Sequence, residues 1–321
     1  MQAIRVEQHG GPEALVPREI DDPTPADGQI RVRVAAAGLN FIDIYHRRGQ
    51  YKLQLPITIG QEGAGVVDAV APGVTAVAVG DRVAWTGQMG SYAELVCIPA
   101  DRAVTVPESV DLRIAAAVML QGMTAHYLVT STFPLQAGHT VLIHAGAGGV
   151  GQLLIQLAKR AGARVLTTVS TAEKAELARA AGADDIINYV ETDFAGEVQR
   201  LVPDGLDVVY ESVGRDTFER SLRCLRMRGY LVLYGQSSGP VDPLDPQRLA
   251  AGGSLFLTRP TLGHYIATRE ELLWRSQELF ELIGHSRLKV RIDREFPLAH
   301  TADAHIYMEQ RRTRGKVLIL P

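Results

Sequence analysis

The stretch Thr140-Val-Leu-Ile-His-Ala-Gly-Ala-Gly-Gly-Val-Gly151 decides the fold of this chain. Its apolar run Val141–Ile143 predicts a buried strand, four glycines follow, and an apolar helical pattern then runs through Leu153–Ala158. A strand, a glycine-rich turn and a helix in this order favour a dinucleotide-binding site. The glycines let the backbone approach a pyrophosphate, and free N–H groups at the helix start face the anion. The alternative is an ordinary glycine-rich turn of an α/β domain.

The bulk composition bounds the class of protein. A chain of 321 residues exceeds what one hydrophobic core usually serves, so we expect two domains. A net charge of −3 lacks the excess of basic residues that is typical of proteins that bind nucleic acid or an anionic membrane. We find no apolar run near the roughly 20 residues that span a bilayer, and no signal peptide at the N-terminus. The two cysteines, Cys97 and Cys224, are most simply buried thiols in a reducing compartment, which predicts a cytoplasmic protein.

The first 125 residues are predicted to be rich in β-structure. Turn signals such as Gly10-Gly11-Pro12 and Pro72-Gly73 separate many short strands, a spacing typical of a small barrel-like domain. Leu112–Val129 is apolar at helical spacing, a pattern interrupted near Gly122, and predicts a helix that leads into the second domain. The expected strands are Ala3–Glu7, Ile30–Ala36, Gly65–Val70, Arg82–Trp85, Tyr92–Ile98 and Ala103–Val106.

From Gly138 the pattern changes to an alternation of strands and helices. Six strands with intervening helices predict a doubly wound parallel sheet of order 3-2-1-4-5-6, so the fold class is α/β. A long helix over about 268–284 and a last strand Lys316–Leu320 close the chain. The six strands are Val141–His144, Arg164–Val169, Asp185–Ile187, Asp207–Tyr210, Tyr230–Tyr234 and Leu255–Thr258, and helices are expected around 150–162, 172–181, 193–202, 216–226, 243–251 and 301–312.

The end of the second strand of the sheet indicates which dinucleotide binds. NAD-specific domains place an Asp or Glu there to receive the ribose hydroxyls. This chain has Ser170 at that point and Lys174 one helical turn later. A hydroxyl and a cation suit a 2′-phosphate, which favours NADPH over NADH. The alternative for Lys174 is a solvated helix residue.

Several sequence motifs outside the glycine-rich turn resemble those of a known protein family. Ala37–Asp43, Gly60–Gly65 and Val79–Val83 resemble the medium-chain dehydrogenase/reductase superfamily, and three later phrases narrow it: Glu211–Thr217, Tyr234–Gly239 and Thr258–Pro260. Together they resemble bacterial NADPH:quinone reductases of the zeta-crystallin type. The resemblance implies a GroES-like catalytic domain over residues 1–123, a Rossmann NADPH-binding domain over 124–262, and a C-terminal part of the catalytic domain over 263–321.

The same resemblance argues against zinc. In zinc-dependent alcohol dehydrogenases of the superfamily, a Cys stands where this chain has Asn40, and a His where it has Gln61. Neither amide is a usual zinc ligand, and the chain has no four-cysteine cluster for a structural zinc. His46, which follows Tyr45 closely, is more simply a surface or packed histidine. We therefore expect a metal-free enzyme that reduces a quinone, an electron-poor acceptor that needs only hydrogen bonding at its oxygen.

The family's cofactor contacts carry over to particular positions of this sequence. The resemblance implies that Asn40, Asp43, Tyr45 and Tyr51 form the catalytic set, although Asp43 alone suits a helix cap and the tyrosines suit core packing. The implied NADPH contacts are Asn40, Phe41, Ile42, Asp43, Tyr45, Thr124, Tyr127, Gly148, Gly149, Val150, Ser170, Lys174, Tyr189, Gly235, Gln236, Ser237, Ser238, Leu257, Thr258, Arg259 and Arg311.

Two other functions remain open at this point. The same scaffold also suits an NADPH-dependent reductase of activated C=C bonds in an enone or alkenal. Relatives of zeta-crystallin also include non-catalytic NADPH-binding and RNA-binding proteins, although the acidic net charge argues against RNA. The apolar strand Leu255–Thr258 at the end of the predicted sheet invites pairing with a second copy, so we expect a homodimer.

Overall fold

The computed structural model describes residues 1–321, which divide into two compact units. Unit 1 comprises Met1–Met123 together with Ile266–Pro321, and unit 2 comprises Thr124–Tyr265. The chain therefore leaves the first unit once and returns to it.

Unit 2 is built on a six-stranded parallel sheet. Its strand order is β11-β10-β9-β12-β13-β14, which confirms the predicted order 3-2-1-4-5-6. The strands are β9 (Thr140–Ile143), β10 (Arg164–Val169), β11 (Asp185–Asn188), β12 (Leu206–Glu211), β13 (Leu225–Leu233) and β14 (Phe256–Thr258). β13 begins five residues before the expected start at Tyr230, so the helix expected around 216–226 is limited to Phe218–Arg223.

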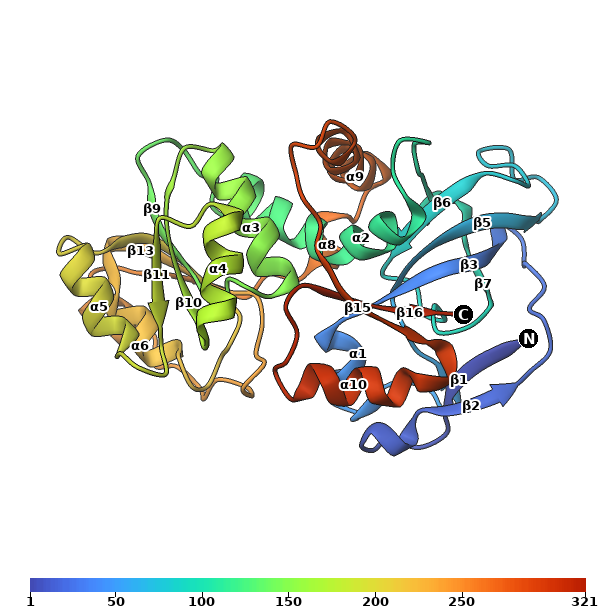
Figure 1. The fold of residues 1–321 in the computed structure, drawn as a ribbon, viewed down its shortest axis with the longest axis horizontal. Coiled ribbons are helices and arrows are strands. Elements are labelled where there is room, and N and C mark those ends of the chain that lie inside the picture. The colour runs from blue at the N-terminus through green and yellow to red at the C-terminus, as the bar shows by residue number, and fades with distance from the viewer. The chain divides into compact units, whose positions relative to one another are not determined.

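Helices cover both faces of this sheet, as the alternation of strands and helices requires. In Figure 1, α3 and α4 lie on one side of the sheet and α5 and α6 on the other. Apolar residues on the second side, among them Phe194, Val198 and Phe218, pack with Leu142 and Leu166 of the strands. The helices are α3 (Gly149–Arg160), α4 (Ala172–Ala181), α5 (Phe194–Leu201), α6 (Phe218–Arg223), α7 (Gln247–Ala251) and α8 (Leu262–Tyr265).

Unit 1 is organised around the long strand β3 (Gln29–Leu39), which pairs with β5, β7 and β16. Its seven-stranded sheet has the order β15-β16-β3-β5-β6-β8, with β7 beside β3, and a three-stranded sheet has the order β2-β1-β4. The other strands are β1 (Gln2–Val6), β2 (Val16–Glu19), β4 (Ile57–Thr58), β5 (Glu62–Val70), β6 (Arg82–Thr86), β7 (Leu95–Pro99), β8 (Val104–Thr105), β15 (Ile292–Pro297) and β16 (Lys316–Leu320).

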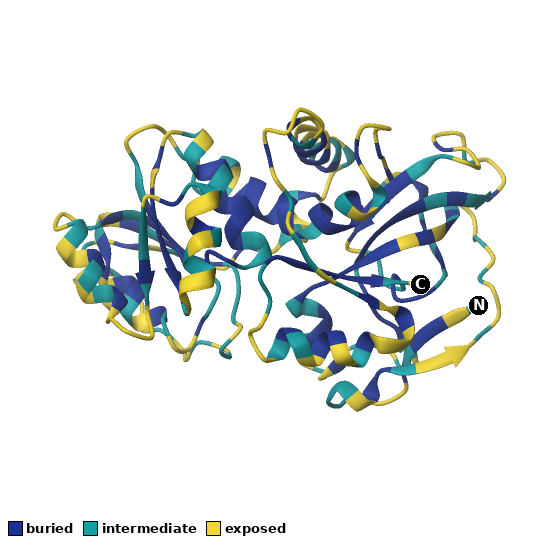
Figure 2. Cartoon of the chain, viewed as in Figure 1, coloured by how far each residue is buried: buried dark blue, intermediate teal, exposed yellow.

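Four helices complete unit 1 or begin in it, besides the one-turn helices. Buried positions alternate along the first part of β3, up to Ala36, whereas Ala36–Leu39 of β3 and Glu62–Gly65 of β5 are buried without interruption (Figure 2). The helices are α1 (Phe41–Arg47), α9 (Arg269–Gly284) and α10 (Thr301–Glu309), and α2 (Leu112–Tyr127) runs from unit 1 into unit 2.

Helix α2 confirms one sequence expectation and departs from another. It is continuous through Gly122, where the apolar spacing breaks because glycine makes room for its neighbours: a Cβ there would lie 2.4 Å from Val118 Cγ2 and 3.1 Å from Leu279 Cδ1. The continuous helical stretch Leu112–Thr132 is also long and apolar enough to cross a membrane, contrary to our reading of the sequence. Since 72% of its most apolar window is buried inside the structure, the stretch packs as a core helix does.

The two cysteines are unpaired, and they differ in burial. Cys224 is buried as expected, and burial raises the pKa of its thiol to about 12. Cys97 in β7 is only partly buried, so the prediction of two buried thiols is wrong for this residue. Its strand pairs with β3, and burial still raises the pKa of its thiol.

Candidate functional site

The glycine-rich turn of unit 2 brings the backbone to the start of helix α3. Gly148 caps this 12-residue helix, and Ala145 has a left-handed conformation with φ of 56°. The turn leaves no room for side chains: a Cβ on Gly151 would lie 2.3 Å from the Ala145 carbonyl oxygen, and one on Gly146 would lie 2.0 Å from Thr167 Oγ1. Free N–H groups at the N-terminus of a helix, next to a closely packed backbone, suit a phosphate group.

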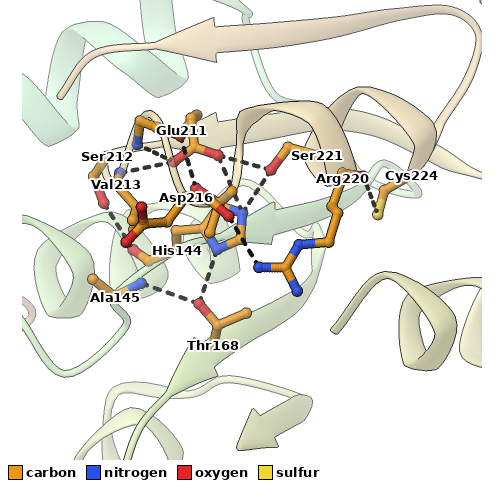
Figure 3. A network of polar contacts seen from close by, with 12 residues as sticks. His144, Ala145, Thr168, Glu211, Ser212, Val213, Asp216, Arg220, Ser221 and Cys224 are labelled. Carbon is orange, nitrogen blue, oxygen red and sulfur yellow. Dashed lines mark hydrogen bonds and ion pairs between the residues drawn. The ribbon is translucent and has the colours of Figure 1, made fainter. Parts of the chain in front are cut away.

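A buried polar cluster supports this turn (Figure 3). We call His144, Thr168, Glu211 and Ser221 the His144 cluster. The His144 ring nitrogens lie 2.9 Å from Thr168 Oγ1 and 2.9 Å from Ser221 Oγ, and the Ser221 hydroxyl donates to Glu211 at 2.7 Å. Thr168 also accepts the Ala145 N–H at 3.3 Å, which ties the cluster to the turn. Burial lowers the pKa of His144, and the neutral ring fits this place between two hydroxyls.

The same cluster fixes the loops that follow the next two strands. Glu211 at the end of β12 accepts the N–H groups of Val213 at 2.7 Å and Gly214 at 3.1 Å. The loop after β13 is joined to this one, because the N–H of Ser238 donates to the Val213 carbonyl at 2.8 Å. Carboxyl ends of parallel strands meet at one edge of a sheet, which is where ligands of such folds bind.

The residues expected at the 2′-phosphate lie after the second and third strands. Ser170 directly follows β10, and Lys174 Nζ donates to Ser170 Oγ at 3.3 Å. Thr171 caps helix α4 by accepting the Lys174 N–H at 3.2 Å. Tyr189 follows β11 and is exposed over 44% of its surface. The structure therefore brings Ser170 and Lys174 together, at the strand end where the sequence predicts them.

The other residues expected to contact the cofactor from unit 2 lie in three places. Tyr127, on α2, is buried and stacks on Tyr265 with ring centroids 4.2 Å apart. Through this stack Tyr127 packs in the interior of unit 2, and Thr124 one turn earlier is buried as well. The rest follow or belong to the last strands: Gly235, Gln236, Ser237 and Ser238 come after β13, Leu257 and Thr258 belong to β14, and Arg259 follows it.

In unit 1 the expected catalytic residues gather at the start of helix α1. Asp43 Oδ2 accepts the Asn40 N–H at 2.9 Å and the Tyr92 hydroxyl at 2.9 Å, whereas its Oδ1 has no partner. Burial raises the pKa of this carboxyl to about 7, against the effect of both hydrogen bonds. The ring of Tyr45 lies 6.4 Å from that of Phe41 and 6.2 Å from that of Tyr51. Helix α1 therefore groups five of the expected residues.

Ile42 also belongs to this group, whereas Arg311 lies outside it. Ile42 lies in the first turn of α1 and is only partly buried. Arg311 follows the last turn of α10, because that helix ends at Glu309, three residues before its expected end. Its backbone has a left-handed conformation with φ of 57°.

The side chain of Asn40 is held by a second buried cluster, which we call the Asn40 cluster: Asn40, Glu62, Gln121 and Lys316. Asn40 Nδ2 donates to Glu62 at 2.8 Å and to the Gly38 carbonyl at 3.2 Å. Asn40 Oδ1 accepts from Lys316 at 2.8 Å and from Gln121 at 3.2 Å. A primary amide has two donors and two acceptor positions, so the amide of Asn40 is saturated within the protein.

Sequence reasoning missed Glu62, Gln121 and Lys316. A weak signal for Lys316 existed, because it begins the otherwise apolar strand β16 and is itself fully buried, which is rare for lysine. Glu62 lies inside the glycine-rich phrase Gly60–Gly65, whose family resemblance drew attention to Gln61 instead.

The positions that hold zinc in related dehydrogenases carry amides here. Gln61 Nε2 lies 3.4 Å from either ring nitrogen of His46, and burial lowers the pKa of this histidine to about 4. No group of three or more His, Cys, Asp and Glu side chains is placed to hold a metal ion.

A β-rich unit with a long central strand, joined to a doubly wound sheet with a glycine-rich turn, defines the class of medium-chain dehydrogenases and reductases. Residues 26–108 match the family described as the alcohol dehydrogenase GroES-like domain, and residues 149–273 match the one described as zinc-binding dehydrogenase. The second description concerns the family as a whole, since the metal positions of this chain are occupied as described above.

Individual relatives place the chain more closely. It is 45% identical to the quinone oxidoreductase of Pseudomonas aeruginosa, with 99% of each chain covered. It is 42% identical to the 2-haloacrylate reductase of a Burkholderia species, over 100% of this chain and 99% of the relative. The structure of the Escherichia coli quinone oxidoreductase complexed with NADPH has a TM-score of 0.98, at 42% identity and full coverage of both chains. The chain belongs to the zeta-crystallin-type quinone oxidoreductases of the medium-chain dehydrogenase/reductase family.

Proposed function

We propose that this protein is an NADPH-dependent quinone oxidoreductase. The observation that carries the proposal is the glycine-rich turn with the Ser170–Lys174 pair beside it, in a chain 45% identical to a quinone oxidoreductase. The Escherichia coli relative was solved with NADPH, and this chain matches it over its full length.

The residues of unit 2 fit the phosphates of this cofactor. Gly148 caps helix α3, and Gly149 and Val150 begin it. The Gly148 N–H donates to the Ala145 carbonyl at 2.9 Å, whereas the first N–H groups of the helix itself have no acceptor within the helix and suit a pyrophosphate. A Cβ at Gly151 would lie 2.3 Å from the Ala145 carbonyl oxygen, so the turn can pack this closely against the start of the helix only with glycine at this position. Ser170, Lys174 and Tyr189 would hold the 2′-phosphate. The Ser170 hydroxyl and the Lys174 ammonium already meet at 3.3 Å, and no carboxylate stands at the end of β10 to repel the phosphate.

The residues of unit 1 would hold the nicotinamide end. When bound, NADPH supplies the hydride that reduces the acceptor. We assign Phe41, Ile42 and Tyr45 of α1 to contacts that orient the nicotinamide, and Tyr51 to the acceptor. Because the side-chain amide of Asn40 already makes four hydrogen bonds within the protein, we assign this residue no direct bond to the substrate; it positions the start of helix α1. Asp43, with a pKa raised to about 7 and an unpartnered oxygen, is suited to hold or release a proton as the acceptor oxygens are protonated.

A second candidate reaction is reduction of an activated C=C bond. A relative 42% identical over the whole chain is a 2-haloacrylate reductase, whose substrate contains such a bond. The decisive experiment is a parallel assay of NADPH oxidation with a naphthoquinone, a short enone and 2-chloroacrylate, with radical detection for the quinone. We expect the highest kcat/KM with the quinone. If only the enone or the acrylate is turned over, the protein is a C=C reductase and the proposed quinone activity is wrong. If NADPH is not oxidised with any acceptor, a non-catalytic nucleotide-binding role is favoured.

The reaction should need no metal, because amides occupy the ligand positions at Asn40 and Gln61. We expect prolonged chelation to leave quinone reduction unchanged. Stoichiometric zinc in the purified protein, with loss of activity on its removal, contradicts this assignment.

We further propose a homodimer formed through the edge strand β14, near Leu255–Thr258. β14 is the last strand of its sheet and is paired on one side only. Phe256 stacks on Tyr230 with centroids 4.4 Å apart and still exposes 47% of its surface, and Met227 is also exposed. Light scattering at micromolar concentration should give twice the monomer mass, and Phe256→Lys should lower it. A monomeric wild type disproves this pairing.

We also assign the protein to the cytoplasm. Both of its cysteines are free thiols, which is the ordinary state in a reducing compartment. Detection of the intact protein in a periplasmic extract contradicts this assignment.

A further inference from the structure

The Asn40 cluster contains a fully buried ion pair. Lys316 Nζ contacts Glu62 Oε2 closely, and both side chains are almost completely removed from solvent. Glu62 Oε1 is also occupied, since it accepts the Leu120 N–H of helix α2 at 2.6 Å. A buried ion pair is rarely a net source of stability, because desolvation offsets most of the attraction between the charges. The presence of this buried ion pair is therefore not explained by a contribution to the stability of the fold.

Gly38 makes room for this pair. A Cβ on Gly38 would lie 2.2 Å from Glu62 Oε2 and 2.7 Å from Lys316 Cε. The φ of this glycine is not in the left-handed region, so the residue is needed here for space rather than for conformation. The backbones of β3, β5 and β16 can therefore approach one another around the two charged side chains only with glycine at position 38.

We propose that Glu62 and Lys316 are positioning residues for hydride transfer, which act through Asn40 on the start of helix α1. This proposal rests on the proposed oxidoreductase function. The pair fixes both ends of the Asn40 amide, with Nδ2 held by Glu62 and Oδ1 by Lys316. Asn40 is in turn the residue at which α1 begins, and its N–H is bound by the Asp43 carboxylate. The first turn of α1 carries Phe41, Ile42 and Asp43, so a shift of Asn40 moves the residues assigned to the nicotinamide.

The charges also act on Asp43 directly. The Lys316 ammonium lowers the pKa of this carboxyl and the Glu62 carboxylate raises it, while Tyr92 donates a hydrogen bond that lowers it. Replacing Lys316 by a neutral residue therefore raises the pKa of Asp43, and replacing Glu62 lowers it, besides any change in its position.

The test uses Lys316→Met, Glu62→Gln and the double variant of the full-length protein. Each single variant leaves one buried charge unpaired and should lower Tm, whereas the double variant should recover much of it. We expect kcat to fall about 10- to 100-fold in all three variants, because a misplaced contact of about 1 Å can reduce the rate by about 100-fold. The Kd for NADPH should change less than about twofold, since its phosphate contacts are assigned to unit 2. Amide hydrogen exchange of residues 40–47 should become faster in the double variant.

Val32→Ala serves as the matched control, because it removes two methyl groups from a buried position of β3, the strand between those that carry Glu62 and Lys316. It should lower Tm without lowering kcat. A double variant that recovers both Tm and kcat, or a Val32→Ala that loses kcat in proportion to Tm, overturns the positioning role. If the wild type itself fails to reduce a quinone, the proposed function is wrong. The hydrogen-exchange result still decides whether the pair fixes α1, and unchanged exchange in the double variant refutes that.

Discussion

The two buried polar clusters differ in how completely their members are paired. In unit 2 the His144 cluster satisfies both ring nitrogens of His144 and both carboxylate oxygens of Glu211. In unit 1 the Asn40 cluster and its surroundings are incompletely paired. The four buried side-chain atoms without a hydrogen-bond partner all belong to unit 1: Asp43 Oδ1, Thr86 Oγ1, Gln121 Oε1 and His305 Nε2.

This difference distinguishes support of a binding loop from support of a reacting site. A fully satisfied network fixes one backbone geometry, which is what the glycine-rich turn needs. Buried atoms without partners are rare and are tolerated where they serve another purpose, such as catalysis or binding of a ligand. Asp43 and Gln121, which carry two of the four atoms, both contact Asn40. We therefore expect changes in unit 2 to alter cofactor affinity or stability, and changes in unit 1 to alter turnover.

The broadest loss is expected from Gly151→Ala, because it changes the turn itself and should weaken the binding of both NADPH and NADH. The new Cβ would lie 2.3 Å from the Ala145 carbonyl oxygen, so the backbone has to move. Overpacking of this kind is worth about 1–3 kcal/mol, and its upper end corresponds to a loss of about 100-fold in NADPH affinity. Fluorescence titration should show equal losses for NADPH and NADH. Gly263→Ala is the control, because its Cβ would meet nothing within 4 Å. Wild-type affinity in Gly151→Ala contradicts the assignment of the turn to the pyrophosphate.

Lys174→Ala should separate the two cofactors. Loss of a charge-assisted hydrogen bond to the 2′-phosphate removes about 1.5–3 kcal/mol, which weakens NADPH binding about 10- to 150-fold. NADH binding and kcat at saturating NADPH should change little, and Ser170→Asp added to this variant should favour NADH further. Lys159→Ala is the control, because its ammonium pairs with Asp184 at 2.7 Å on the same unit. If NADPH and NADH lose affinity equally, or neither loses any, Lys174 does not bind the 2′-phosphate and is a solvated helix residue.

Glu211→Gln should test the His144 cluster through stability. If the new NH₂ group faces Val213 and Gly214, both of their backbone hydrogen bonds to this side chain are lost. If it faces Ser221, the hydroxyl can no longer donate to this side chain and has to accept from it, which disturbs its contact with His144. We expect the free energy of unfolding to fall by about 1–3 kcal/mol, the range for an unsatisfied buried group. Urea unfolding measures this loss, and kcat at saturating NADPH should stay near that of the wild type. If kcat falls while the free energy of unfolding is unchanged, the His144 cluster affects turnover as the Asn40 cluster does, and the proposed difference between the two clusters is wrong.

The fold of unit 2 could be predicted because its signals are local. Each strand and helix there is a short apolar or amphipathic run, and the Ser170–Lys174 contact joins residues four positions apart. The same holds for the start of α3, where the glycines themselves are the signal. In unit 1 the short strands β2 and β4 escaped prediction, since each has only a few residues and Pro17 interrupts the pattern of the first.

The Asn40 cluster could not be predicted because its members are distant in the sequence. Lys316 meets Asn40 across 276 positions and Glu62 across 254, and nothing local marks a lysine as buried. Only the pairing of β16 with β3 brings them together. Burial of a charged side chain depends on this tertiary pairing rather than on propensity, and the same is true of the raised pKa of Asp43.

The smallest expected effect concerns Asp43 and the pH dependence of stability. Its pKa is raised from 3.8 to about 7, so the native state binds a proton that the unfolded chain has already lost above pH 5. The stability that Asp43 contributes is therefore greatest at low pH and declines as the pH rises through 7. Between pH 6 and pH 8 the loss amounts to about 1.4 kcal/mol. Asp43→Asn cannot ionise and should lack this component.

Buried histidines oppose this trend and make the comparison with the variant necessary. Burial lowers the pKa of His305 to about 3 and that of His144 below its usual value, so both favour folding above pH 6.5 and lose that contribution as the pH falls below it. Because they are the same in both proteins, the difference in free energy of unfolding between wild type and Asp43→Asn isolates the carboxyl. Urea unfolding at pH 6, 7 and 8 should show this difference shifting by about 1.4 kcal/mol in favour of the variant. A difference that stays constant over this range means that Asp43 is ionised throughout, and its unpartnered oxygen then carries no proton for the reaction.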